Sequence, residues 1–128
     1  MSLVGEHQLR KVTGISESQI EAINNFLQGA IYCWCKNKNL DDWFSLSALM
    51  GGDNFYWQGT PLMCLYTKHE ENGSGNPVNR AGIDAGWLLK SVIVNDSRHF
   101  ETKKEFIVGV VKNVYKQQLR MDSQRVKF

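Results

Sequence analysis

Apolar residues recur at helical spacing in four parts of the chain, and each part opens on a residue type suited to begin a helix. Ser16 and Gln19 are spaced as a capping box, which predicts a helix over residues 16–37. Thr60 is expected to cap another helix because Pro61 suits the first helical position. The patterns after the first predict three further helices, at residues 45–50, 60–69 and 77–94.

The last of these predicted helices, at residues 77–94, carries its apolar residues on one side and two glycines four residues apart. Ala81, Ala85 and Leu88 share a face, and we expect that face to lie in the core. Gly82 and Gly86 weaken a helix, so we expect their missing side chains to let another helix pack closely.

The periodicity changes after Ser97, where β-branched and aromatic residues become frequent. Residues 98–102 and 105–115 are predicted strands, and Lys103 and Lys104 are predicted to form the turn between them. A two-stranded hairpin is not stable alone, so it must dock on the helices. The fold class predicted is mainly α with a small C-terminal antiparallel β-hairpin.

This order of elements resembles the winged-helix form of the helix-turn-helix domain. The residues that carry the resemblance are those at 44–49, 60–62 and 86–90 and the hairpin at 98–115. The resemblance implies a single winged-helix-like domain over residues 16–115, in which a recognition helix contacts DNA. Helices 60–69 and 77–94 both occupy positions that fit a recognition helix.

The two ends of the chain lie outside this predicted domain. Residues 1–15 are interpreted as an N-terminal segment whose start, Met1-Ser2-Leu3, is typical of an expression tag. Residues 116–128 are interpreted as a basic C-terminal arm.

Charge is divided unevenly along the chain. Residues 1–64 carry four basic and six acidic residues, whereas residues 65–128 carry eleven basic and seven acidic residues. Basic residues on a hairpin tip and a C-terminal arm are suited to bind phosphates at any sequence. We therefore expect a non-catalytic nucleic-acid-binding module. The candidate contacts are Arg80, Lys90, Arg98, Lys103, Lys104, Lys112 and Lys116.

The alternative is a protein–protein interaction or homodimerisation domain. The C-terminal end of helix 16–37 is apolar on all sides, and three aromatic residues follow one another in a glycine-flanked loop. The candidate interface residues are Tyr32, Trp34, Phe55, Tyr56 and Trp57. Trp57 also has a plainer interpretation as a core residue.

The sequence carries no catalytic constellation, and we expect neither an enzyme nor a bound cofactor. Cys33, Cys35 and Cys64 lack the spacing of zinc ligands, so no metal site is expected. Cys33 is predicted to be an inert core residue. An odd number of cysteines is typical of the reducing cytoplasm. No apolar run reaches the roughly 18 residues of a membrane span, so no membrane partner is expected.

Overall fold

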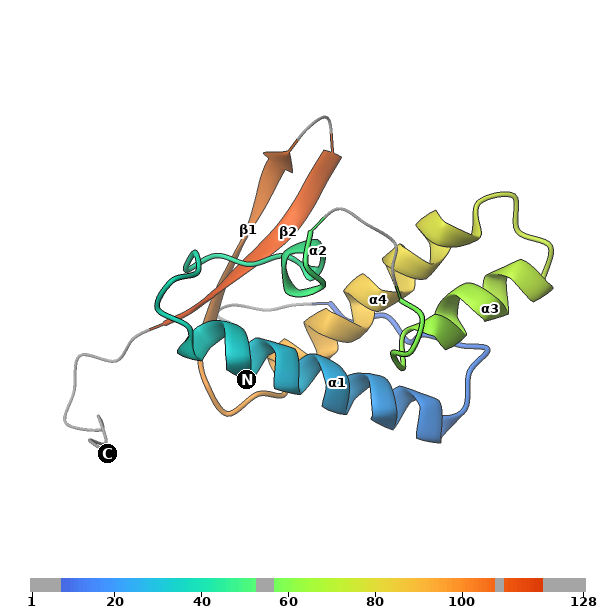
Figure 1. Cartoon of the computed structure of the whole chain (residues 1–128), viewed down its shortest axis with the longest axis horizontal. Helices are drawn as coiled ribbons and strands as arrows, with labels where there is room; N and C mark the ends of the chain where they lie inside the picture. Colours follow the sequence, from blue (N-terminus) through green and yellow to red (C-terminus); the bar gives the residue numbers. More distant parts are fainter. Residues whose placement is uncertain (1–7, 53–56, 108–109, 119–128) are drawn as a thin grey trace.

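Local sequence signals set the first elements of the chain. In the computed structural model, which describes residues 8–52, 57–107 and 110–118, Ser16 Oγ accepts a hydrogen bond from the Gln19 N–H at 3.1 Å. The Gln19 Oε1 in turn accepts from the Ser16 N–H at 2.8 Å, which completes the capping box. The described elements are α1 (Glu17–Lys36), α2 (Leu46–Leu49), α3 (Met63–Glu71), α4 (Pro77–Val94), β1 (Phe100–Ile107) and β2 (Val110–Gln117) (Figure 1).

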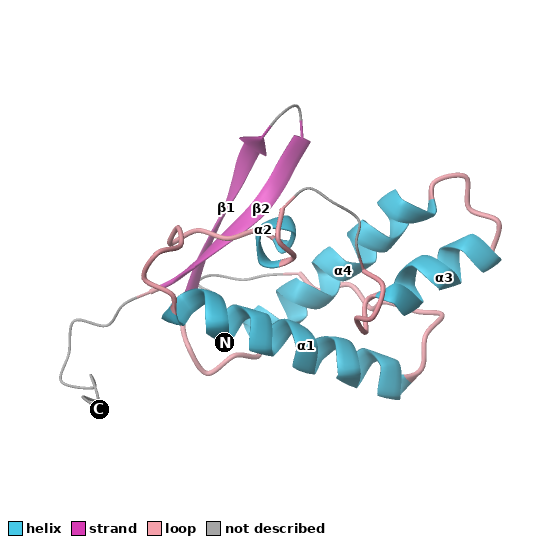
Figure 2. Cartoon of the chain, viewed as in Figure 1, coloured by secondary structure: helices cyan, strands magenta, loops and turns pink. Residues whose placement is uncertain are grey.

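The structure confirms the predicted fold class, because helices are followed by a C-terminal antiparallel hairpin (Figure 2). The arrangement is compatible with a winged-helix-like layout. In the segment that connects α1 to α2, Phe44 forms an antiparallel bridge with Tyr115 of β2, which extends the small sheet. The division of the chain into a domain and two terminal segments stays a prediction.

The third helix begins later than expected. It starts at Met63, so the prediction that Thr60 caps it directly is wrong. Thr60 instead stabilises the turn before the helix, where its Oγ1 accepts from the Leu62 N–H at 3.2 Å and donates to the Trp57 carbonyl at 2.8 Å. These two hydrogen bonds hold Trp57 close to the start of α3.

Helix α4 lies at the centre of the molecule, beside both α1 and α3 (Figure 1). It begins at Pro77, as predicted, and ends at Val94. Its buried face meets the apolar side of α1, and the shared core includes Ile23, Leu27, Ile31, Ala81, Ala85, Leu88 and Leu89. Gly82 and Gly86 lie off this face, and a Cβ built on either would meet no neighbouring atom within 4 Å. The expectation that they admit a closely packed helix is wrong.

The hairpin differs from its prediction in the position of the turn. Strand β1 runs through both Lys103 and Lys104, which pair with Val114 and Asn113 of β2. The two lysines therefore lie in mid-strand and not at the tip. Neighbouring residues of a strand point to opposite faces, so these two side chains belong to different surfaces.

Aromatic side chains join the hairpin to the helices. Phe44 packs edge-to-face on Phe100, with ring centroids 6.2 Å apart, and lies 6.0 Å from the ring of Tyr115. All three are buried. Burial raises the pKa of Tyr115 to about 12, because the ionised phenolate is poorly solvated there.

A buried carboxylate in the middle of α4, that of Asp84, ties this helix to its neighbours. Asp84 Oδ2 lies 2.6 Å from Lys68 Nζ and 2.7 Å from His69 Nε2, which ties α3 to α4. Lys68 also donates to the Thr13 carbonyl at 2.7 Å. The three-way contact holds the segment before α1, α3 and α4 together.

Candidate binding groove

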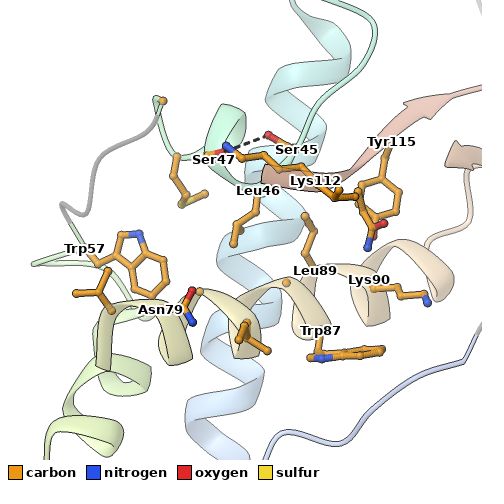
Figure 3. Close-up of a pocket in the computed structure, with 18 residues that line it drawn as sticks. Ser45, Leu46, Ser47, Trp57, Asn79, Trp87, Leu89, Lys90, Lys112 and Tyr115 are labelled. Atoms are coloured by element: carbon orange, nitrogen blue, oxygen red, sulfur yellow. Dashed lines mark hydrogen bonds between the residues drawn. The ribbon is translucent and has the colours of Figure 1, made fainter. Parts of the chain in front are cut away.

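A groove lies between α2, the outer side of α4 and strand β2 (Figure 3). Its volume is about 700 Å³, which is within the range of pockets that take small molecules or peptide side chains. Leu46 points from α2 toward α4, and Tyr115 contributes from β2 (Figure 3). Trp57 and Lys90 lie at its opposite ends (Figure 3).

The α4 side of the groove includes two glycines one helical turn apart. Gly82 and Gly86 line the space, and no atom of a described neighbouring residue lies within 4 Å of a Cβ placed at either position. This part of the wall is bare helix backbone. An occupant can therefore come closer to α4 here than a larger residue would permit.

Large apolar side chains stand exposed in and beside the groove. Val78 and Ile83 of α4 are 44% and 45% exposed, and Val111 of β2 is 61% exposed. Phe106 is 71% exposed and is the cross-strand partner of Val111, so both lie on one face of the hairpin. Exposed apolar residues that gather around a hollow are typical of a binding site.

The charges that line the groove are positive. Lys90 lies with its Nζ 5.4 Å from the centroid of Trp87, and Arg10 approaches the same ring at 6.0 Å. Lys112 donates to Ser47 Oγ at 3.0 Å across the space between β2 and α2 (Figure 3). Among the described lining residues there is no Asp or Glu.

The predicted phosphate contacts do not form one surface. Lys103 and Lys116 approach the ring of Trp43, at 4.3 and 5.6 Å, on one face of the hairpin. Lys104 belongs to the other face, and Arg80 is exposed on α4. Of the predicted set, Lys90 and Lys112 line the groove.

Arg98 is held in an ion pair inside the fold. Its guanidinium donates to both carboxylate oxygens of Asp96, at 3.0 and 2.8 Å, and Gln28 donates to the same carboxylate. Burial opposes ionisation of Asp96, but these hydrogen bonds outweigh it and hold the pKa of Asp96 below its ordinary value. An arginine in this setting stabilises the junction of α4 and β1.

The predicted interface residues differ in how exposed they are. Tyr32 is 55% exposed, whereas Trp34 is half-buried and donates from Nε1 to the Asp41 carbonyl at 2.8 Å. Trp57 is only 6% exposed, which confirms its interpretation as a core residue. Phe55 and Tyr56 lie outside the described residues.

The cysteines lie in different environments. Cys33 is exposed, so its prediction as a core residue is wrong. Burial raises the pKa of Cys35 above its ordinary value, which disfavours the reactive thiolate. Within residues 8–52, 57–107 and 110–118, no cluster of three potential metal ligands occurs and no helix is long and apolar enough to cross a membrane.

The groove was not predicted from the sequence. The positions of Val78 and Ile83 on α4 resemble ordinary core positions, and only the three-dimensional packing leaves them uncovered. The two glycines were the available signal, because a pair at helical spacing marks a face without side chains.

No known protein family, curated protein or solved structure matches the chain.

Proposed function

We propose that this chain is a non-catalytic protein-binding module that holds an apolar segment of a partner protein in the groove between α4 and the hairpin. One observation carries the proposal. The groove combines a bare backbone wall at Gly82 and Gly86 with the exposed apolar side chains of Ile83 and Val111. Covering those side chains would remove apolar surface from water, which favours association.

The surface suits a protein segment better than a phosphate backbone. A helix that reads DNA presents arginine, lysine or amide side chains to the base edges. The groove side of α4 instead presents mainly apolar residues and glycines, and its described polar side chains are Asn79 and Lys90, one toward each end. Apolar lining with few polar groups is typical of sites that bind protein side chains.

The experiment selects peptides from a displayed library of random linear sequences, with the whole chain as bait. Each enriched peptide is then measured against Gly86→Leu, whose side chain would occupy the groove. The matched control is Gly29→Leu, because Gly29 is also helical and also has open space at its Cβ. Both variants replace glycine by a better helix former, so both should fold.

The proposal expects enriched peptides that lose affinity by at least about tenfold on Gly86→Leu and bind Gly29→Leu as they bind the unchanged chain. Two results would overturn it. One is a library that yields no enriched peptide, and the other is a set of peptides that bind both variants equally.

The second candidate is the phosphate-binding module expected from the sequence. It is favoured by Lys112 and Lys116 on β2, which precede three more basic residues, Arg120, Arg125 and Lys127, in the rest of the sequence. This candidate is tested by measuring binding to random duplex DNA with fluorescence anisotropy at two salt concentrations. Lys116→Glu should weaken that binding at every sequence and flatten its salt dependence. Unchanged binding would remove this candidate.

A further inference from the structure

The outer edge of β2 bears on what kind of segment the groove accepts. Tyr115 uses both its N–H and its carbonyl to pair with Phe44, at 2.8 Å each, on the side of β2 that faces away from β1. In an antiparallel strand every second residue directs its backbone groups to the same side. Val111 and Asn113 therefore direct their N–H and carbonyl groups to the edge that Phe44 begins to cover.

Among the described residues, no further backbone hydrogen bond is made to that edge beyond Tyr115, because the chain turns away from it. After Phe44 the backbone enters the cap of α2, where Ser45 Oγ accepts from the Ala48 N–H at 3.2 Å. The third strand is thus limited to one residue. Val111 and Asn113, the next two outward positions of β2, are exposed and line the groove.

We propose that the occupant is an extended segment of a partner protein that adds to the outer edge of β2 as a strand, continuing the line that Phe44 begins. This inference rests on the proposed function. Exposed edges of this kind are established templates for strand addition, in which main-chain hydrogen bonds give affinity and pockets select alternate side chains.

The groove and the charges define the chemistry of that segment. Residues opposite Val111 and Asn113 place their side chains on the hairpin face shared with Phe106 and Tyr115, so those residues should be apolar. The lysines that line the groove, Lys90 and Lys112, favour acidic residues among the others. The expected segment alternates apolar residues with polar residues that include Asp or Glu.

The same charges argue against two other occupants. Residues 119–128 of this chain carry three basic residues and one acidic residue, so they match the groove poorly. A second copy paired edge to edge through β2 would bring Lys112 and Lys116 near the same lysines of its partner. Like charges across paired strands are destabilising.

The experiment uses three displayed libraries of peptides of about six residues, the usual length of a strand. In the first, Val, Ile, Leu and Phe alternate with Asp, Glu, Ser and Thr. In the second, the same residues have apolar positions at helical spacing. A third library exchanges the acidic residues of the first for Lys and Arg and serves as the charge control.

Enrichment from the first library, well above the other two, is the expected result. Peptide binding should then slow amide hydrogen exchange at Val111 and Asn113 by at least about tenfold, since both N–H groups would become hydrogen-bonded. Asn113→Pro removes one outward N–H without removing a donor to β1, and should weaken peptide binding by a similar factor. The folding of this variant is checked by circular dichroism, and the exchange data on the unchanged chain stand without it.

The outcomes separate this inference from the proposed function. Peptides that depend on Gly86 but leave exchange at Val111 and Asn113 unchanged would overturn strand addition and leave the groove intact as a binding site. Enrichment of the helical library would do the same. Preference for the basic library would overturn the predicted charge of the partner. Failure of all three libraries counts against the groove itself.

Discussion

Replacing Gly86 by alanine is expected to stabilise the folded chain. Glycine in a helix interior costs about 1 kcal/mol relative to alanine, because it loses more backbone freedom on folding. At most helix–helix contacts that gain would be cancelled by a clash. Here the added Cβ would meet no atom of a described neighbouring residue within 4 Å, so the full gain is expected. The same reasoning applies to Gly82, and the double variant should gain about 2 kcal/mol.

The assay is urea denaturation followed by far-ultraviolet circular dichroism. Each substitution should raise the free energy of unfolding by about 1 kcal/mol, which corresponds to a rise of about 3–6 °C in Tm for a domain of this size. Gly29→Ala on α1 is the matched control, since it is also helical with open space around it, and should show a similar gain.

Replacing Gly14 by alanine is expected to lower the free energy of unfolding instead. Its φ of +84° is unfavourable for alanine, and a Cβ there would lie 2.6 Å from Lys68 Cδ.

If Gly82→Ala or Gly86→Ala destabilised the protein while Gly29→Ala stabilised it, another surface would have to cover this side of α4. The account of an open groove would then be refuted.

Three further predictions concern the core. Trp57→Ala should lower the free energy of unfolding by about 3–5 kcal/mol in urea denaturation, because the side chain is buried; a loss below about 0.5 kcal/mol would place it at the surface. Asp84→Ala should lower the free energy of unfolding by about 3 kcal/mol in the same assay, since it leaves the largely buried Lys68 ammonium without its carboxylate, and an unchanged free energy of unfolding would show that the ion pair is not maintained in solution. Because Tyr115 stays neutral in the folded chain up to a pKa of about 12, against about 10 when unfolded, the unfolded state releases its proton first as pH rises. The free energy of unfolding should therefore fall by about 1.4 kcal/mol between about pH 9 and pH 11, and Tyr115→Phe should lessen that fall; an equal fall in both proteins would contradict the burial.

The helices were predictable because their signals are local. Ser16 with Gln19, Ser45, and Pro77 each mark a helix start through interactions within a few residues, and each start is confirmed. Thr60 carries an equally local signal but bonds within the preceding turn, so its hydroxyl stabilises a different element from the one expected.

The hairpin turn was not predictable from residue types in the same way. Lys103 and Lys104 are polar residues between two β-rich stretches, which favoured a turn, but side chains on alternate faces of an exposed strand are polar as well. Strand β1 continues to Ile107 and β2 begins at Val110, and the pairing of the two strands is a tertiary contact that decides the register. Moving the turn changes the surface to which each lysine belongs.

The groove exists because neighbouring elements of the described structure leave one side of α4 uncovered. Periodicity indicates which residues of a helix are apolar, and it identified the buried Ala81, Ala85 and Leu88 correctly. It does not show how many sides of the helix find a neighbour. Ile83 and Val78 are left exposed because α2 has only four residues and the hairpin extends away from α4 (Figure 1).

The most direct test of the groove is a titration of isotope-labelled protein with an enriched peptide, followed by amide chemical shifts. We expect the largest shifts at Gly82 and Gly86 on α4 and at Val111 on β2. Shifts that centred on Trp43, on the other face of the hairpin, or on Tyr32 of α1 would contradict it.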